Sequence, residues 1–399
     1  MTKTESKLVL INGIFNFANV LSTSFVSVFI YTYTQSLVMM SIYTIIRIGL
    51  FPFFFTIGGK TVRKYPYSLT FASGLFFLTI MMIYILAAQG LFEKEPLFVY
   101  IAAIFYGVGE GLYWFSVNNS NQIAPLPEHR GDYLANVGIG NNITSIIAPV
   151  ISSLILGFVT NQMYGYYGIF ALVIICYIII TIISLTLNIE NKETRDFKVV
   201  SHIIPNTKDK NWLMIQSSTF FYGFQNSLSL TMTNILIYNA TGGSDSLYSN
   251  LLIFFSIAAI ASFYIMRQKM NETNMFRYFK IGLFFIVTSA LALVFFENVW
   301  GAIYFGLTNA LGTALYGNPY NLSMLNSIAV YDKKENVAGR VIAKETAMSI
   351  GRCTGMAMIV LCYFVFGEPN YMAIAVSICS IMPIFVYLII KHYYKKEGS

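Results

Sequence analysis

The sequence predicts an all-α membrane protein of twelve transmembrane helices, arranged as two six-helix halves. Of its 399 residues, 56% are hydrophobic and 11% are charged, and the mean hydropathy is +0.63. A water-soluble domain of this length cannot bury so much apolar surface, so lipid must be the solvent for most of the chain. Apolar stretches of about 20 residues, the length that crosses a bilayer core as a helix, recur from one end to the other.

These stretches give the expected spans in order. Runs such as 174–187 are apolar on every side, which favours helices over the short alternating segments of a β-barrel. The first span follows a short charged leader without a small-residue cleavage site, so we expect it to remain as the first helix. The expected spans are 8–30, 38–57, 68–89, 97–118, 136–158, 166–188, 213–236, 248–266, 279–296, 300–322, 341–364 and 371–390.

The positive charges predict the orientation of these spans. Of the 25 Lys and Arg residues, 21 lie at the N-terminus, in the loops that follow even-numbered spans, and at the C-terminus. The alternate loops hold Lys94 alone. Because positive residues are retained on the cytoplasmic side, we expect a multi-pass protein of the cell membrane, the inner or cytoplasmic membrane in bacteria, with both termini in the cytoplasm.

An internal repeat relates the two halves. Residues 19–31 align without gaps onto 226–238, and five of the thirteen positions are identical at an offset of 207. An offset of 208 also places Gly131 on Gly339 and Ala135 on Ala343. The sequence therefore predicts an N-terminal half at 1–188, a polar cytoplasmic linker at 189–212, and a C-terminal half at 213–399.

Two parallel six-helix repeats joined by a long cytoplasmic linker resemble the major facilitator superfamily over the whole chain. Its loop motif between helices 2 and 3 is present in altered form, because residues 58–64 (Gly-Gly-Lys-Thr-Val-Arg-Lys) keep a glycine and the basic residues but lack the acid and the second glycine. Helix 5 is similar to the superfamily's antiporter motif, with small residues in place of its glycines. The motif positions are Thr144, Ala148, Pro149, Ser152 and Ser153.

Charged residues in the middle of a span are costly, so each is a functional candidate. Arg47 and Glu110 fall at similar depths in helices 2 and 4, where they could form an ion pair. Glu110 lies between Gly109 and Gly111, and we expect the glycines to leave room for this carboxylate to bind and release a proton. Glu345 is a second candidate for proton coupling or gating. A permanent structural pair between Arg47 and Glu110 is the alternative.

Amides and aromatic residues are concentrated in helices 1, 4, 7 and 10, which the resemblance places around the central cavity. Unpartnered amides are unfavourable in lipid, so these groups should face water, substrate or one another. Some amides could instead serve only to join neighbouring helices. Together with Arg352 of helix 11, the candidates for substrate binding are Asn12, Asn16, Asn19, Tyr113, Trp114, Asn118, Gln225, Asn226, Asn309, Tyr316, Asn318 and Tyr320.

These residues predict a secondary active transporter. An aromatic, amide-rich and nearly uncharged pocket suits a neutral or amphipathic small molecule, and the helix 5 motif favours proton-coupled export by alternating access. A lipid or glycolipid flippase and a sugar or metabolite importer remain alternatives on the same fold.

Other functional classes receive no support from the sequence. A membrane enzyme would need clustered His, Asp or Glu at a membrane surface, but the cytoplasmic loops hold dispersed charges. We expect no metal, no cofactor and no nucleic acid partner. The expected partners are the small-molecule or lipid substrate, protons and membrane lipid, and we expect a monomer.

Overall fold

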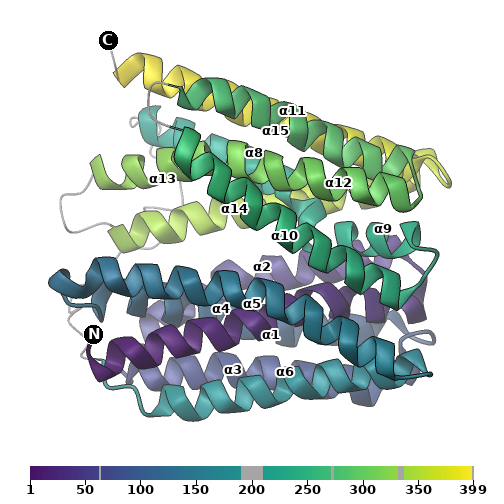
Figure 1. The fold of residues 1–399 in the computed structure, drawn as a ribbon, viewed down its shortest axis with the longest axis horizontal. Helices are drawn as coiled ribbons and strands as arrows, with labels where there is room; N and C mark the ends of the chain where they lie inside the picture. Colours follow the sequence, from purple (N-terminus) through teal and green to yellow (C-terminus); the bar gives the residue numbers. More distant parts are fainter. Residues whose placement is uncertain (63, 190–209, 271–273, 331–336, 398–399) are drawn as a thin grey trace. The chain divides into compact units, whose positions relative to one another are not determined.

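The structure is a computed structural model that describes residues 1–62, 64–189, 210–270, 274–330 and 337–397. All regular secondary structure in these residues is helical (Figure 1). The chain divides into two compact units, Met1–Arg195 and Asp196–Ser399. Of the linker expected at 189–212, residues 190–209 lie outside the described residues.

The first unit is a bundle of six continuous helices. Helix α1 packs against α5 and α6, while α4 packs against α2 and α3, and α3 also contacts α6. Short 3₁₀ turns at Gln89–Leu91 and Pro127–His129 precede α4 and α5. The six helices are α1 (Lys3–Thr34), α2 (Leu37–Thr61), α3 (Tyr67–Ala88), α4 (Pro96–Ile123), α5 (Arg130–Phe158) and α6 (Gln162–Leu185).

Local sequence signals start several of these helices. Thr2 and Glu5 form a reciprocal capping box at the start of α1, and the Ser36 side chain caps α2. Pro96 is the first residue of α4, where its missing N–H costs nothing.

The second unit contains the other six spans. Helix α8 packs against α14 and α15, α11 packs against α12 and α15, and α10 packs against α12. The helices are α8 (Lys210–Leu230), α9 (Met232–Ala240), α10 (Asp245–Lys269), α11 (Met275–Phe295), α12 (Val299–Gly312), a π-helical turn (Thr313–Gly317), α13 (Asn318–Val330), α14 (Val337–Phe366) and α15 (Tyr371–Glu397).

The twelve expected spans are confirmed as helices, but the seventh is broken into two helices and the tenth contains a π-helical turn. Ten described helices are long and apolar enough to cross a membrane on their own. The seventh span breaks at Thr231, whose φ of −143° and ψ of −50° separate α8 from α9. Ser and Thr alternate at positions 227, 229, 231 and 233, and such hydroxyls compete with the helix for backbone groups.

The tenth span remains helical but departs from α-helical geometry for a different reason. Its π-helical turn at Thr313–Gly317 is followed closely by Pro319. A proline lacks the N–H that would bond the carbonyl four residues earlier and clashes with that carbonyl, so the helix must widen there. The continuous span expected at 213–236 is therefore corrected to two helices, whereas the span expected at 300–322 is helical throughout and contains a π-helical turn.

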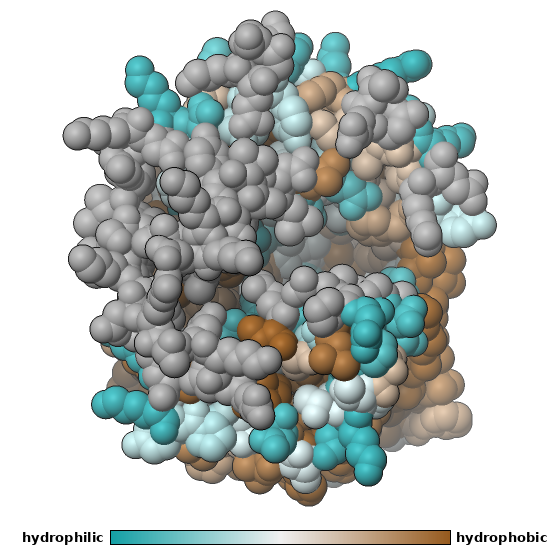
Figure 2. All heavy atoms as spheres, turned by 90° about the vertical axis from the view of Figure 1, so that its left-hand side faces the viewer, coloured by the Kyte–Doolittle hydropathy of each residue, from teal (hydrophilic) through white to brown (hydrophobic). Residues whose placement is uncertain are grey.

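The flanks of the helices are apolar, as a lipid-exposed surface requires. Large hydrophobic side chains such as Phe76, Ile182, Phe284 and Leu388 are more than half exposed. Figure 2 looks at the helix ends that include the start of α1, and it shows hydrophilic side chains gathered at these ends and hydrophobic ones along the flank. The chain is a multi-pass membrane protein.

Candidate functional site

The first unit contains a buried ion pair between α2 and α4. Arg47 Nε and Nη2 donate to Glu110 Oε2 and Oε1, each over 2.7 Å. The exposed fraction is 5% for Arg47 and 6% for Glu110. The ion pair suggested by the sequence is thus present in two-bond geometry, which satisfies both carboxylate oxygens and fixes the guanidinium.

The Arg47 guanidinium also contacts a second side chain of α4, that of Tyr106. Arg47 Cζ lies 3.7 Å from the centre of the Tyr106 ring, a cation–π distance. The Tyr106 hydroxyl hydrogen-bonds the Ser22 hydroxyl over 3.0 Å, and both residues are buried. Ser22 belongs to α1, so this cluster joins three helices.

The glycines around Glu110 have a different role from the one expected. A Cβ at Gly107 would collide with the Arg47 carbonyl, and one at Gly111 would lie 2.8 Å from the Phe51 carbonyl. Gly109 instead meets Leu78 of α3. These glycines permit close packing against α2 and α3, so the expectation that they leave room beside the carboxylate was wrong.

The amides of α1 mainly join helices. Asn12 Nδ2 donates to Asn121 Oδ1 of α4 over 3.2 Å. Asn16 Nδ2 donates to Thr144 Oγ1 over 2.8 Å and to the Asn141 carbonyl over 3.0 Å, both in α5. Asn19 is partly exposed. At Asn12 and Asn16 the structure therefore shows the helix-joining alternative.

The candidates in α4 divide into buried and partly exposed side chains. Tyr113 is fully buried, and its ring stacks on Phe15 with 3.6 Å between centroids. Trp114 meets Phe15 edge to face and is partly exposed. Asn118 is also partly exposed, and Asn119 donates to the Tyr67 hydroxyl.

The antiporter-like stretch of α5 includes buried positions. Ala148 and Ser152 are fully buried, and Ser152 Oγ donates to the Pro149 carbonyl. Thr144 accepts the bond from Asn16 described above. Ser153 is partly exposed. Because α5 packs on α1, these small residues act at least as a packing face.

Three tyrosines of the second unit form a stack between α8 and the tenth span. The rings of Tyr222 and Tyr320 are 3.9 Å apart and 2° from parallel, and Tyr316 lies 6.1 Å from Tyr222 at 6°. Tyr316 and Tyr320 are buried, with hydroxyls that donate to the Pro383 carbonyl and to Thr219 Oγ1. Tyr222 is partly exposed, and its exposed part is available to a solute.

Arg352 of α14 contacts α8 at Asn226, about one helical turn beyond Tyr222. Its Nε donates to Asn226 Oδ1 over 3.1 Å. Glu345 lies two turns before Arg352 and pairs with the adjacent Lys344, with 3.5 Å between Oε1 and Nζ. The charged groups of α14 are thus only partly buried, unlike the pair in the first unit.

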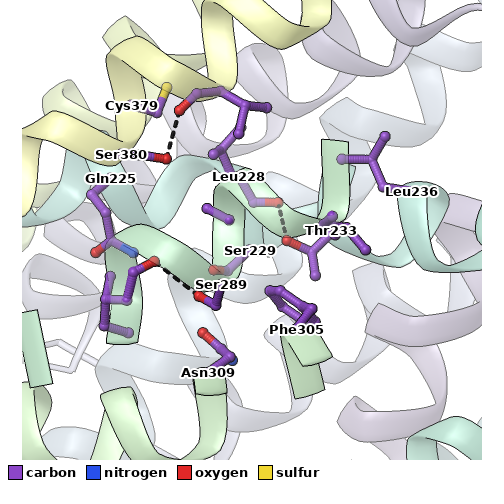
Figure 3. Close-up of a pocket in the computed structure, with 14 residues that line it drawn as sticks. Gln225, Leu228, Ser229, Thr233, Leu236, Ser289, Phe305, Asn309, Cys379 and Ser380 are labelled. Atoms are coloured by element: carbon purple, nitrogen blue, oxygen red, sulfur yellow. Dashed lines mark hydrogen bonds between the residues drawn. The ribbon is translucent and has the colours of Figure 1, made fainter. Parts of the chain in front are cut away.

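A cavity opens where α8 breaks (Figure 3). Its free volume of about 30 Å³ is room for roughly two water molecules. Gln225 and Asn309 were predicted to bind substrate and both line it, whereas Asn318 begins α13 and is not among the lining residues. Polar and apolar groups share the wall: Gln225, Ser229, Thr233, Ser289, Asn309 and Ser380 on the polar side, and Leu228, Leu236, Leu293, Phe305 and Val376 among the apolar ones.

Sequence reasoning missed a polar contact near the N-terminus. The Glu5 carboxylate is fully buried, accepts a bond from the Leu126 N–H over 3.0 Å, and lies 3.2 Å from His129 Nδ1. This contact fastens His129 to α1. The capping box of Thr2 and Glu5 was the visible signal, although it does not reveal a partner more than 120 residues away.

The combined arrangement suits binding and conformational change better than covalent chemistry. Among the described residues no group of three His, Cys, Asp or Glu side chains could hold a metal ion. The four cysteines are free, and three of them are buried. What the described residues offer is one buried charged pair, one tyrosine stack and one uncharged cavity.

Comparisons with known proteins agree with this architecture. A family model described as Major Facilitator Superfamily matches residues 121–356, more than half of the chain. The chain is 21% identical to an uncharacterized protein, YqgE, from Bacillus subtilis (strain 168), over 98% of this chain and 90% of the relative.

Solved transporter structures share the fold at low sequence identity. The nucleoside transporter NupG superimposes with a TM-score of 0.70 and 11% identity, covering 99% of this chain and all of that one. A bacterial homologue of the iron transporter ferroportin gives a TM-score of 0.69 and 10% identity, with 98% and 99% of the two chains covered. A bacterial homologue of the lysosomal transporter Spinster gives 0.66 and 10%, with 99% and 98% covered.

Proposed function

Because the chain belongs to the major facilitator superfamily and is a secondary transporter of that type, we propose that it exports a neutral or amphipathic small molecule in exchange for protons. The observation that carries the substrate class is the chemistry of the second unit, where the partly exposed ring of the tyrosine stack and the uncharged amides near it are the groups open to a solute. Alternating access, the mode of transport that the superfamily implies, is the proposed mechanism.

The second unit supports a ring-bearing or sugar-like solute. Tyr222 presents a partly exposed ring backed by two buried tyrosines, and Gln225 and Asn226 follow within about one turn of α8. Aromatic faces bind flat or apolar surfaces, and amides bind hydroxyl or amide groups. A dianion would need clustered bases here, and Arg352 is the one base that the described residues place beside this face.

The Arg47–Glu110 pair supports the proposed coupling. A buried carboxylate held by an arginine can take up a proton when the pair separates, and Tyr106 gives Arg47 a second favourable contact in that case. Proton uptake by Glu110 would then accompany a change in the packing of α2 against α4. A permanent structural pair is the outcome that the experiments below must be able to detect.

The proposed direction of transport rests on helix α5. Its stretch 144–153 resembles the antiporter motif, and the positive-inside distribution of Lys and Arg supports cytoplasmic termini. Transport of a substrate from the cytoplasmic side of inside-out vesicles, driven by an imposed proton gradient, is the expected activity. Accumulation in right-side-out vesicles instead would identify an importer.

The first experiment identifies the solute. Purified full-length protein is screened by thermal shift against separate panels of hydrophobic drugs, neutral sugars and nucleosides, and lipid headgroup analogues. We expect stabilisation by a neutral member of the first two panels. Stabilisation confined to lipid analogues, followed by headgroup translocation in labelled liposomes, would support the flippase instead.

A further inference from the structure

The break in α8 leaves backbone carbonyls without their usual helical partners. Helix α8 ends at Leu230, and the Leu228 carbonyl accepts a bond from Thr233 Oγ1 over 3.1 Å. The C-terminal end of a helix carries partial negative charge on such carbonyls. This end of α8 forms part of the wall of the cavity, because Leu228, Ser229 and Thr233 line it.

The cavity's buried hydroxyls act toward its interior as hydrogen-bond acceptors. Ser289 Oγ donates to the Ile286 carbonyl over 2.8 Å, and Ser380 Oγ donates to the Val376 carbonyl over 2.7 Å (Figure 3). Thr233 donates to Leu228 in the same way. Each hydroxyl has one hydrogen, so the lone pairs are what these oxygens can still offer to an occupant of the cavity.

Three further polar groups of the wall have no protein partner. The amides of Gln225 and Asn309 and the hydroxyl of Ser229 make no hydrogen bond within the part of the chain that the structure describes. Ser229, Ser289 and Asn309 all line the cavity (Figure 3). Oxygen acceptors therefore come from α8, α11 and α12 together.

We propose that this cavity is a binding site for a monovalent cation, Na⁺. A cation is favoured because side-chain oxygens of α8, α9, α11, α12 and α15 line a compact space. None of the fourteen lining residues is charged, which disfavours divalent cations because these are bound through carboxylates or imidazoles. This cation site is additional to the proposed proton exchange. That exchange depends on Glu110, which belongs to the other unit.

Thermal unfolding of the full-length protein in detergent tests the site directly. The unfolding temperature is measured in NaCl, in KCl and in N-methylglucamine chloride, each at 150 mM and the same pH. We expect NaCl to raise it above the other two salts by about 2–4 °C, the shift that saturation of a weak site produces. Equal unfolding temperatures in the three salts would mean that water alone occupies the cavity, and the proposal would be wrong.

Two neighbouring residues of α11 provide a matched pair of variants. Ser289→Ala removes a cavity oxygen, whereas Thr288→Val removes a partly exposed hydroxyl that does not line the cavity and bonds the Phe284 carbonyl over 3.0 Å in the same way. We expect the Na⁺-specific shift to disappear in Ser289→Ala and to persist in Thr288→Val. Persistence in both variants, or loss in both, would contradict the assignment.

A second cavity variant keeps the test informative if Ser289→Ala does not fold. Asn309→Leu keeps the approximate size of the side chain but removes its amide oxygen, and Asn309 is only partly buried. We expect it to unfold near the wild-type temperature in N-methylglucamine chloride and to lose the Na⁺ shift. The solute-dependent stabilisation and the proton exchange are measured on the same variants, so failure of the cation site and failure of the proposed function are distinguishable.

Discussion

The two units differ in how they accommodate polar groups inside the membrane. The first unit keeps its helices continuous and buries one charged pair, Arg47 and Glu110, between α2 and α4. In the second unit, one span is broken at Thr231, another contains a π-helical turn, and the cavity at the break in α8 is lined by uncharged residues. The two units are therefore divided by the polar groups inside them, a buried charged pair in the first and uncharged side chains around a cavity in the second.

This difference has a physical reason. A buried ion pair is stable only if its geometry is held tightly, and the close helix contacts at Gly107 and Gly111 hold it. Discontinuous helices expose backbone groups that need partners or ligands, so they are tolerated where a cavity or binding face exists. The predictions below test how far this division extends.

The largest expected effect comes from separating the charges of the first unit. Glu110→Gln leaves Arg47 buried without its counter-charge and should lower the free energy of unfolding by about 3–5 kcal/mol. The double variant Arg47→Gln/Glu110→Gln should recover much of this loss because neither charge remains. Chemical or thermal unfolding in detergent measures both values.

The matched control is the pair of the second unit. Glu345→Gln removes a partner from the partly exposed Lys344–Glu345 contact and should change the free energy of unfolding by at most about 1 kcal/mol. Equal losses of unfolding free energy in Glu110→Gln and Glu345→Gln would contradict the expectation that the buried pair contributes more to stability than the partly exposed one.

Helix contacts give the next largest effect, and here the two units should behave alike. Gly107→Ala in α4 and Gly351→Ala in α14 each place a Cβ against a neighbouring carbonyl, so each should cost about 1–3 kcal/mol. Gly13→Ala is the control, because nothing lies within 4 Å of its added Cβ. A tolerated Gly107→Ala would mean that the α2–α4 contact is looser than described.

The tyrosine stack should affect ligand binding in the second unit. Tyr222→Leu removes the partly exposed ring and should weaken binding of the solute by about 3- to 10-fold, whereas Tyr222→Phe keeps the ring and should bind nearly as well. Titration of unfolding temperature against solute concentration provides the affinities. The account of this face fails if Leu and Phe at position 222 are equivalent.

The smallest effect is expected for an amide that joins two helices of the first unit. Asn16→Ala removes bonds to Thr144 and Asn141 in α5 and should cost about 0.6–1.7 kcal/mol, with solute affinity unchanged. Asn136→Ala, at an exposed position in the same unit, should be nearly neutral. A loss of solute affinity in Asn16→Ala would instead indicate that Asn16 contributes to solute binding.

Much of the fold was predictable because membrane helices are specified by local sequence. Stretches of about 20 apolar residues and the distribution of Lys and Arg act within one span or loop, so the order of the helices could be read directly. The breaks were not found because hydropathy averages over the hydroxyls of 227–233 and over Pro319. Alternating Ser and Thr was the signal that could have indicated the first of these breaks.

The site was predictable only where depth along a helix decides the contact. Arg47 and Glu110 could be matched because α2 and α4 are alternate spans expected to run in the same direction, so similar positions along them give similar depth. Which helix each glycine of 107–111 faces depends on the rotation of α4, and the partner of Glu5 depends on how a loop folds back. The cavity arises from a space left among α8, α9, α11, α12 and α15, and no single segment of sequence encodes it.

Proton movement in proteoliposomes tests the central claim most directly. Liposomes that contain a pH-sensitive dye and either wild-type protein or Glu110→Gln are given a gradient of the solute found by the thermal-shift screen. The account predicts a solute-dependent pH change with wild-type protein and none with Glu110→Gln, while exchange of labelled solute at equal concentrations persists in both. An undiminished pH change with Glu110→Gln would show that Glu110 only fastens α2 to α4.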